Sequence, residues 1–140
     1  MKPNLIVVAG PNGAGKTTIT EKLLRHKWME GCVYINPDVI AQEKFGGWNS
    51  QGAIIKAANH AQEIREECLA TIKSMAFETV FSIPEKVHFV NRAKEAGFLF
   101  DCFLSVRMIH QLMHNALLYV LWKVGMMFLF RKLSTAIIDR

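Results

Sequence analysis

The sequence has 140 residues, a length that suits one domain with a hydrophobic core of its own. Because 51% of the residues are hydrophobic, the composition excludes a disordered chain. The formal net charge of +5 would suit a phosphate-bearing ligand, but no run of lysines and arginines stands out, so a mildly basic surface explains it at least as well.

Strands and helices are expected to alternate along the first 104 residues. Leu5–Ala9 is a continuously apolar run, typical of a strand buried on both faces of a parallel sheet, and it is too short for a signal peptide. This alternation predicts an α/β protein, a three-layer sandwich of the P-loop NTPase type around a mainly parallel sheet whose C-terminal part is incomplete. The later elements are expected as a helix from Lys16 to about Lys27, a strand at Val33–Ile35, a helix from about Ser50 to Met75, a strand at Phe77–Phe81, a helix at Pro84–Ala96 and a strand at Phe98–Leu104.

The longest predicted helix has one apolar face. Arg65 is expected on its solvated face. Phe45 and Trp48, beside a pair of glycines, are expected to pack rather than to line a pocket. The stripe expected to be buried consists of Ile54, Ala57, Ala58, Ala61, Ile64, Cys68, Leu69 and Ile72.

The cysteines favour a reducing compartment. Cys32, Cys68 and Cys102 lie far apart, and none belongs to a closely spaced pair. We therefore expect reduced, mostly buried thiols in a cytoplasmic protein, rather than a metal site or disulfide bonds.

The segment Gly10–Thr17 matches the phosphate-binding pattern G-x-x-x-x-G-K-[ST] without a mismatch, between a predicted strand and a predicted helix. Glycines let backbone N–H groups turn toward an anion, and the helix start adds partial positive charge. Lys16 is placed to reach the outer phosphates of ATP, and the Thr17 hydroxyl to bind Mg²⁺. A glycine-rich turn without a ligand is the alternative. The predicted nucleotide-binding residues are Gly10, Pro11, Asn12, Gly13, Ala14, Gly15, Lys16, Thr17 and Thr18.

Two acidic positions are candidates for the site of a molecule that would accept phosphate from ATP. Asp38 follows the second predicted strand, at the sheet edge where α/β folds bind ligands, so it could accept a proton from an acceptor hydroxyl; capping the next helix is an equally good explanation. Glu78 and Thr79 lie within an otherwise apolar strand, and a buried carboxylate is costly unless it is paired or binds something. An edge strand with Glu78 facing water is the alternative.

Four segments resemble the zeta toxin family in order and spacing, and the resemblance extends from residue 1 to about residue 104. It implies a P-loop kinase that uses ATP and Mg²⁺ to phosphorylate a hydroxyl of a small acceptor, such as a UDP-linked amino sugar. An antitoxin protein is an implied partner, and no nucleic acid is expected. The segments that carry the resemblance are Gly10–Thr18, Asn36–Ala41, Phe77–Ser82 and Arg92–Phe98.

The resemblance also assigns roles to single residues. It implies that Asp38 is the catalytic base, which favours this role over capping. Glu78 and Thr79 would contact the acceptor. Lys16 would bind ATP, and Thr17 would bind Mg²⁺.

Residues 105–140 form a divergent apolar tail that lacks the family's arginine motifs. We consider the neighbouring reading frame, in which the third base of each codon is joined to the first two bases of the next codon. In this frame the codons of Met108–Ile109 must encode Asp, and those of Trp122–Lys123 must encode Glu. The codons permitted at the other positions are compatible with the missing arginine segment and its Gly-Gly-His. We therefore hypothesise a frameshift, equivalent to one deleted base, between about Leu104 and Arg107. Phosphate transfer by this chain would then be impaired.

Taken at face value, the tail allows other interpretations. Leu112–Phe130 is about as long as a membrane span, although polar residues interrupt it. It could be a transmembrane helix, with membrane association of an inactive remnant, or an apolar helix packed on the sheet. A nucleotide-binding ATPase module without an acceptor is the remaining alternative.

Overall fold

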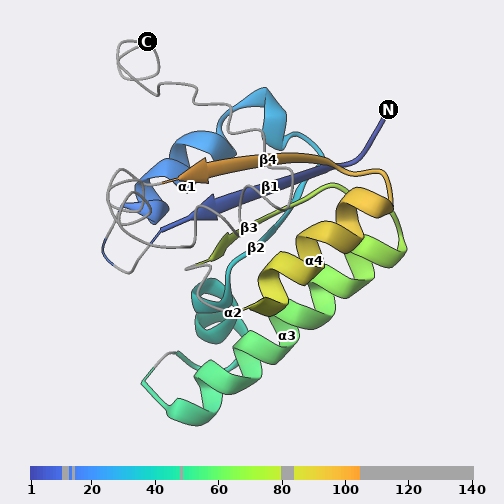
Figure 1. Ribbon diagram of the computed structural model, residues 1–140. Helices are drawn as coiled ribbons and strands as arrows, with labels where there is room; N and C mark the ends of the chain where they lie inside the picture. The colour runs from blue at the N-terminus through green and yellow to red at the C-terminus, as the bar shows by residue number, and fades with distance from the viewer. Residues whose placement is uncertain (11–12, 14, 48, 80–83, 105–140) are drawn as a thin grey trace.

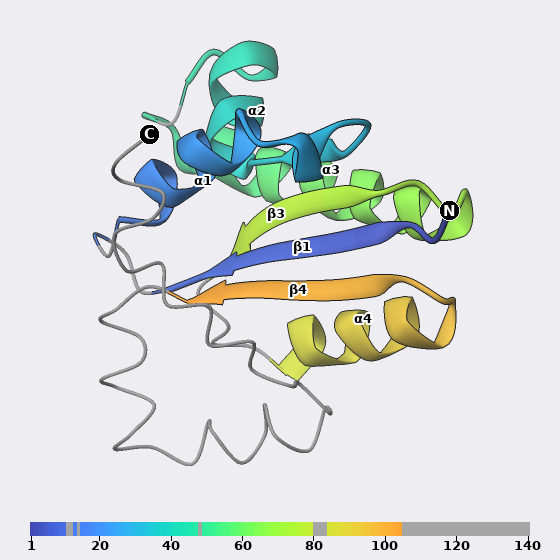
Figure 2. The ribbon, with the colours of Figure 1, turned by 90° about the horizontal axis from the view of Figure 1, so that it is seen from above.

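The computed structural model describes residues 1–10, 13, 15–47, 49–79 and 84–104. Their strands form a parallel four-stranded sheet in the order β2-β3-β1-β4. Figure 2 shows β1 between β3 and β4, with all three arrowheads toward the same edge. The predicted α/β class and parallel sheet are therefore confirmed. The strands are β1 (Asn4–Ala9), β2 (Val33–Ile35), β3 (Met75–Thr79) and β4 (Leu99–Leu104).

Helices cover both faces of the sheet and make the third layer (Figure 1). Helix α1 and a 3₁₀ turn, η1, pack on one face, whereas α2, α3 and α4 lie on the other. Helix α1 ends earlier than predicted, because the chain turns after it and continues as η1. The helices are α1 (Lys16–Leu24), η1 (Lys27–Met29), α2 (Pro37–Lys44), α3 (Gln51–Ala70) and α4 (Pro84–Glu95).

Strand β1 is the centre of the core, buried on both faces as its sequence predicts. Leu5, Val7 and Ala9 face the layer of α2, α3 and α4, where they meet the fully buried Phe77. Ile6 and Val8 face α1. Because successive side chains of a strand point to opposite faces, Glu78, next to Phe77, faces α1.

Helix α3 buries only part of the predicted stripe: Ala57, Ala61, Cys68 and Leu69 are buried as predicted. Ile54 and Ile72 are each 50% exposed, whereas Arg65, predicted to be solvated, is only 6% exposed. The Arg65 guanidinium carbon lies 5.2 Å from the centre of the Phe77 ring, a cation–π contact that compensates its burial. The prediction of a solvated Arg65, which was based only on the charge of the side chain, is therefore wrong. The buried residues of α3 are Ala53, Ala57, Ala61, Arg65, Cys68 and Leu69.

The end of α3 also differs from the prediction. The helix stops at Ala70 rather than near Met75, because Lys73 N–H donates to the Cys68 carbonyl (2.9 Å) and Ile72 adopts a φ of 56°. This pair of features is a Schellman-type helix end. Strand β3 consequently begins at Met75, two residues before the predicted start. Val80 and Phe81, predicted to continue this strand, lie outside the described residues.

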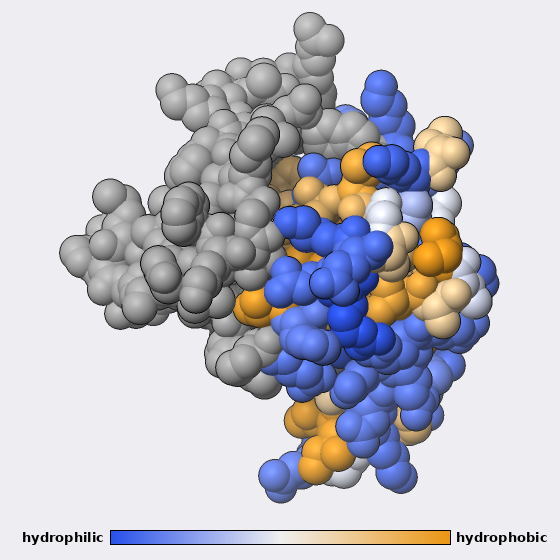
Figure 3. Space-filling model, turned by 45° about the vertical axis from the view of Figure 1, so that its right-hand side comes forward, coloured by the Kyte–Doolittle hydropathy of each residue, from blue (hydrophilic) through white to orange (hydrophobic). Residues whose placement is uncertain are grey.

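The described surface is mixed in character. Figure 3 shows a face that is mainly hydrophilic, with separate hydrophobic patches. Cys68 is buried, whereas Cys32 and Cys102, also predicted to be mostly buried, are half-buried. Within the described ranges no helix is long and apolar enough to cross a membrane. The predictions for Leu112–Phe130 lie outside those ranges.

Candidate active site

The phosphate loop leaves the sheet at the carboxyl end of β1. Gly10 N–H donates to the Thr79 carbonyl at 3.1 Å, which ties the start of the loop to the end of β3. Gly13 and Gly15 have φ angles of 75° and 80°, in the left-handed region that favours glycine. The backbone of the loop thus favours glycine at positions 13 and 15. Pro11, Asn12 and Ala14 lie outside the described residues.

The start of α1 suits an anion. The helix begins at Lys16, and Gly15 at the cap position has no side chain to accept a hydrogen bond from the helix amides. The first turn also contains no acidic residue. The partial positive charge at this helix end is therefore not neutralised from within its own first turn, as a phosphate site requires.

Lys16 lies across the loop. Its ammonium group donates to the Gly10 carbonyl at 2.7 Å, so the positive charge is held at the loop itself. Thr17 and Thr18, in the same turn, are exposed. A lysine held at the loop, exposed hydroxyls and a helix start with no acidic residue in its first turn fit a nucleoside triphosphate with Mg²⁺.

Asp38 lies at the beginning of α2, on the same sheet edge. The helix is capped by Asn36, whose Oδ1 accepts a hydrogen bond from Asp38 N–H at 2.9 Å, and Pro37 occupies the first helical position. The alternative in which Asp38 caps the helix is therefore wrong. The Asp38 side chain is exposed, so its carboxylate is accessible at this edge.

Glu78 is the hub of a polar network between the loop and Asp38. Its Oε1 accepts hydrogen bonds from the hydroxyls of Thr20 (2.7 Å) and Tyr34 (3.1 Å). The Tyr34 hydroxyl in turn accepts one from Asn36 Nδ2 at 3.0 Å. β3 is an inner strand and Glu78 is half-buried, so the alternative of an edge strand with Glu78 facing water is wrong.

Burial affects the ionisation of this network. It raises the pKa of Tyr34 to about 12, against the opposing hydrogen bond from Asn36. Tyr34 is therefore neutral near pH 7 and its hydroxyl proton is available for Glu78. Thr79, next to Glu78, is buried at the end of β3 with 8% exposed.

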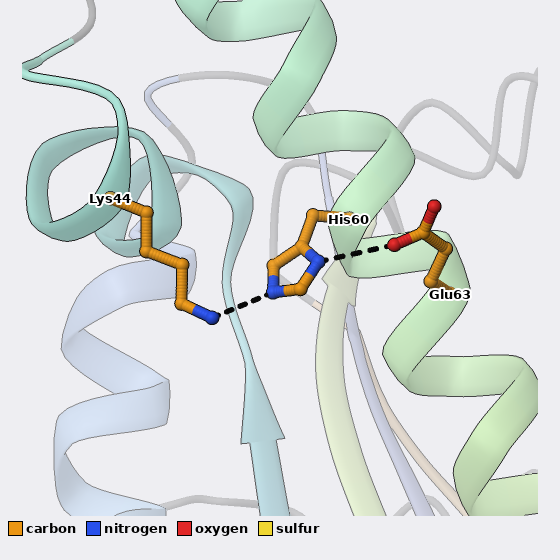
Figure 4. Close-up of polar contacts among 3 residues, drawn as sticks. All are labelled: Lys44, His60 and Glu63. Carbon is orange, nitrogen blue, oxygen red and sulfur yellow. Dashed lines mark hydrogen bonds and ion pairs between the residues drawn. The ribbon is translucent and has the colours of Figure 1, made fainter.

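A second set of contacts fixes the other end of α2. Figure 4 shows His60 of α3 between Lys44 of α2 and Glu63 of α3. Lys44 Nζ lies 2.8 Å from His60 Nε2, and His60 Nδ1 lies 3.2 Å from Glu63 Oε2. A neutral His60 with its proton on Nδ1 satisfies both contacts. Phe45 packs edge-on against the same ring with centroids 6.5 Å apart, as expected for a packing residue.

The structure thus brings Lys16, Asp38 and Glu78 to one region of the sheet. Sequence reasoning missed three members of the site: Thr20, Tyr34 and Asn36. Only Asn36 carried a signal, because Asn followed by Pro is a typical start of a helix. The other two depend on which strands are neighbours.

A parallel sheet, a glycine loop and a lysine–threonine pair at the start of α1 define the class of P-loop kinase-like proteins. Residues 1–104 match the family described as zeta toxin. The chain therefore belongs to the zeta toxin family, which implies nucleotide use, generally with Mg²⁺.

Two solved structures share the fold. One is a candidate kinase from Chloroflexus aurantiacus J-10-fl, with a TM-score of 0.56, 18% identity, and coverage of 82% of this chain and 70% of the other. The second comes from the PezAT chromosomal toxin–antitoxin system of the human pathogen Streptococcus pneumoniae, with a TM-score of 0.56, 18% identity and coverage of 88%. This chain spans 57% of the pneumococcal chain. Among curated protein sequences, none matches it.

Proposed function

We propose that this chain binds ATP with Mg²⁺ at the phosphate loop and transfers the γ-phosphate to a hydroxyl of a small, nucleotide-sugar-like acceptor. The observation that carries the proposal is that the phosphate loop and the Asp38 carboxylate lie at the same edge of the sheet. In the order β2-β3-β1, one strand separates the ends of β1 and β2, which places them about 10 Å apart. That spacing suits a donor site next to an acceptor site.

The residues of the chain would divide the work. Bound ATP and Mg²⁺ would supply the phosphoryl group and the metal charge. Lys16 and the loop amides would hold the phosphates, and the Thr17 hydroxyl would bind the metal. Asp38 would accept the proton of the acceptor hydroxyl. Glu78 and Thr79 are proposed on the family resemblance to contact the acceptor.

We further propose that transfer by this chain is slow. The sequence after residue 104 lacks the family's arginine motifs. An arginine that neutralises the phosphoryl group is worth roughly 10³–10⁵ in rate. Membership of the family supports an antitoxin partner, and the wide spacing of the three cysteines supports a cytoplasmic location, as parts of the same proposal.

Nucleotide binding is tested first, by calorimetry with ATP and Mg²⁺. Lys16→Ala is expected to weaken binding by about tenfold or more, because it removes a charge-assisted hydrogen bond to phosphate. Lys22→Ala is the matched control, since Lys22 is an exposed lysine in the last turn of the same helix. No ATP affinity in the unaltered chain, or equal affinities for all three proteins, would contradict the proposal.

Transfer is tested with Asp38→Asn, using UDP-linked amino sugars as acceptors. This variant keeps the backbone N–H that Asn36 caps and is expected to abolish the residual transfer. Glu43→Gln, an exposed acid on the same helix, is the control and is expected to leave transfer intact. ATP hydrolysis that does not depend on Asp38 would instead favour an ATPase without an acceptor. Rapid transfer would refute the impaired activity.

A further inference from the structure

The polar network around Glu78 connects the two helices that carry the proposed site. Thr20 of α1 and Tyr34 of β2 both donate to the same oxygen, Glu78 Oε1. We propose that Glu78, in addition to the acceptor contact proposed above, acts through its Oε1 as a positioning residue that places Asp38 by way of Tyr34 and Asn36. The reason for placing Asp38 rests on the proposed function, whereas the contacts themselves do not.

The chemistry of Asn36 explains how the placement is transmitted. Its side-chain amide is planar, with one acceptor side and one donor side. Oδ1 accepts from Asp38 N–H, and Nδ2 donates to the Tyr34 hydroxyl. Because Tyr34 holds the donor side, the acceptor side must point toward the start of α2. Loss of the Tyr34 hydroxyl would leave the amide free to rotate away from Asp38.

Glu78 fixes the Tyr34 hydroxyl in turn. A hydroxyl has a single proton, and a carboxylate has none to give at neutral pH. With its proton committed to Glu78, Tyr34 can only accept from Asn36, so every bond in the chain has one direction. Burial of Tyr34 strengthens this arrangement, because unpaired polar groups are costly there.

Thr20 brings the phosphate-loop helix to the same carboxylate. It is 3% exposed and lies one turn after Lys16 in α1. Its Oγ1 is 2.7 Å from Glu78 Oε1 and 2.9 Å from the Lys16 carbonyl. The helix that begins at the phosphate loop and the cap that holds Asp38 are thus attached to one atom of β3.

Hydrogen exchange of single amides tests the proposal on the full chain without nucleotide. Tyr34→Phe removes only the hydroxyl and is expected to speed exchange of the Asp38 amide about three- to tenfold, the size of a weakened helix cap. Glu78→Leu is expected to act in the same way. Glu78→Gln keeps an acceptor oxygen and is expected to restore most of the protection.

The start of α3 provides a matched control. Ala53 N–H donates to Ser50 Oγ at 3.1 Å, a helix cap that does not involve Glu78. Exchange of the Ala53 amide is expected to stay within about twofold in Tyr34→Phe, whereas Ser50→Ala speeds Ala53 and leaves Asp38 unchanged. Equal acceleration at both amides would mean general loosening and would overturn the proposal, as would an unchanged Asp38 amide.

A double-mutant cycle covers the case in which Tyr34→Phe disturbs the sheet. Asn36→Ser keeps a capping oxygen but has no amide for Tyr34 to hold. In that background, Tyr34→Phe is expected to have no further effect on the Asp38 amide, and an effect of undiminished size would refute the route through Asn36. Since no ATP is present, failure of this test is distinct from failure of ATP binding, which the comparison of Lys16→Ala with Lys22→Ala decides separately.

Discussion

At the scale of single residues, Tyr34 gives the site a measurable pH dependence. Burial raises its pKa from the ordinary value of 10.0 to about 12. The proton therefore binds more tightly in the folded than in the unfolded chain. Stability from this group is fully present below about pH 10 and is lost as the pH rises toward 12. Ionisation of Tyr34 also removes the proton that Glu78 accepts.

We predict that unfolding by urea will require less denaturant as the pH rises from 9 to 11.5. In Tyr34→Phe the midpoint of urea unfolding is expected to fall less steeply over the same pH range, because the variant has no proton to lose at position 34. The absorbance of tyrosinate gives an independent check, since the variant should lack a component that titrates near pH 12. Parallel curves for the two proteins would show that Tyr34 titrates normally.

Arg65 shows what a single buried charge does to the core. Its burial lowers the pKa of the guanidinium, while the carboxylates of Glu85 and Glu66 act in the opposite direction. The Phe77 ring beneath it is itself packed edge-on against Phe89, with centroids 5.9 Å apart. The contact therefore connects α3, β3 and α4 through one charged side chain and two rings.

At the scale of elements, the end of α3 stores strain. Ile72 adopts a φ of 56°, a conformation that is unfavourable for a β-branched residue and normally taken by glycine at this position of a Schellman motif. The Ile72 side chain contributes little packing energy to offset this strain, because it is 50% exposed. The backbone, rather than the side chain, dictates the residue best suited to this site.

We accordingly predict that Ile72→Gly will raise the free energy of unfolding by about 0.5–1 kcal/mol. Ala70→Gly, two residues earlier at the last position of the helix, is the control and is expected to lower it by up to about 1 kcal/mol. Urea unfolding of both variants measures the difference. A loss of stability in Ile72→Gly as large as in Ala70→Gly would show that the strain at Ile72 is negligible.

The same helix end shows why the sequence predicted the elements better than their limits. Hydrophobic periodicity and glycine or proline signals located every strand and the helices α1, α3 and α4, because burial of apolar faces dominates their formation. The short helix α2 was expected only through the capping alternative for Asp38. The stop at Ala70 came from backbone hydrogen bonds with neither glycine nor proline to mark it. Likewise the loop was predictable from its motif, but the contacts of Glu78 with Thr20 and Tyr34 depend on strand order, which no local pattern encodes.

At the scale of the whole molecule, the distribution of functional groups is uneven. The described residues supply a phosphate loop, a lysine and an exposed carboxylate at one edge of the sheet. The family match ends at residue 104. The arginines that the resemblance leads us to expect would come from the sequence that follows. The rate of phosphate transfer by the whole chain therefore depends on whether the gene still encodes these arginines.

We predict that the gene carries a frameshift equivalent to one deleted base between codons 104 and 107. Its nucleotide sequence provides the first check: codons for Lys123-Val124-Gly125-Met126 that cannot yield Gly-Gly-His in the neighbouring frame would end the hypothesis. Insertion of one base in that interval is expected to restore the arginine segment and to increase phosphate transfer roughly 10³–10⁵-fold, because arginines neutralise charge on the transferred group. The gain should vanish with Asp38→Asn and persist with Glu43→Gln. A restored frame that encodes arginines yet transfers no faster would refute their proposed role.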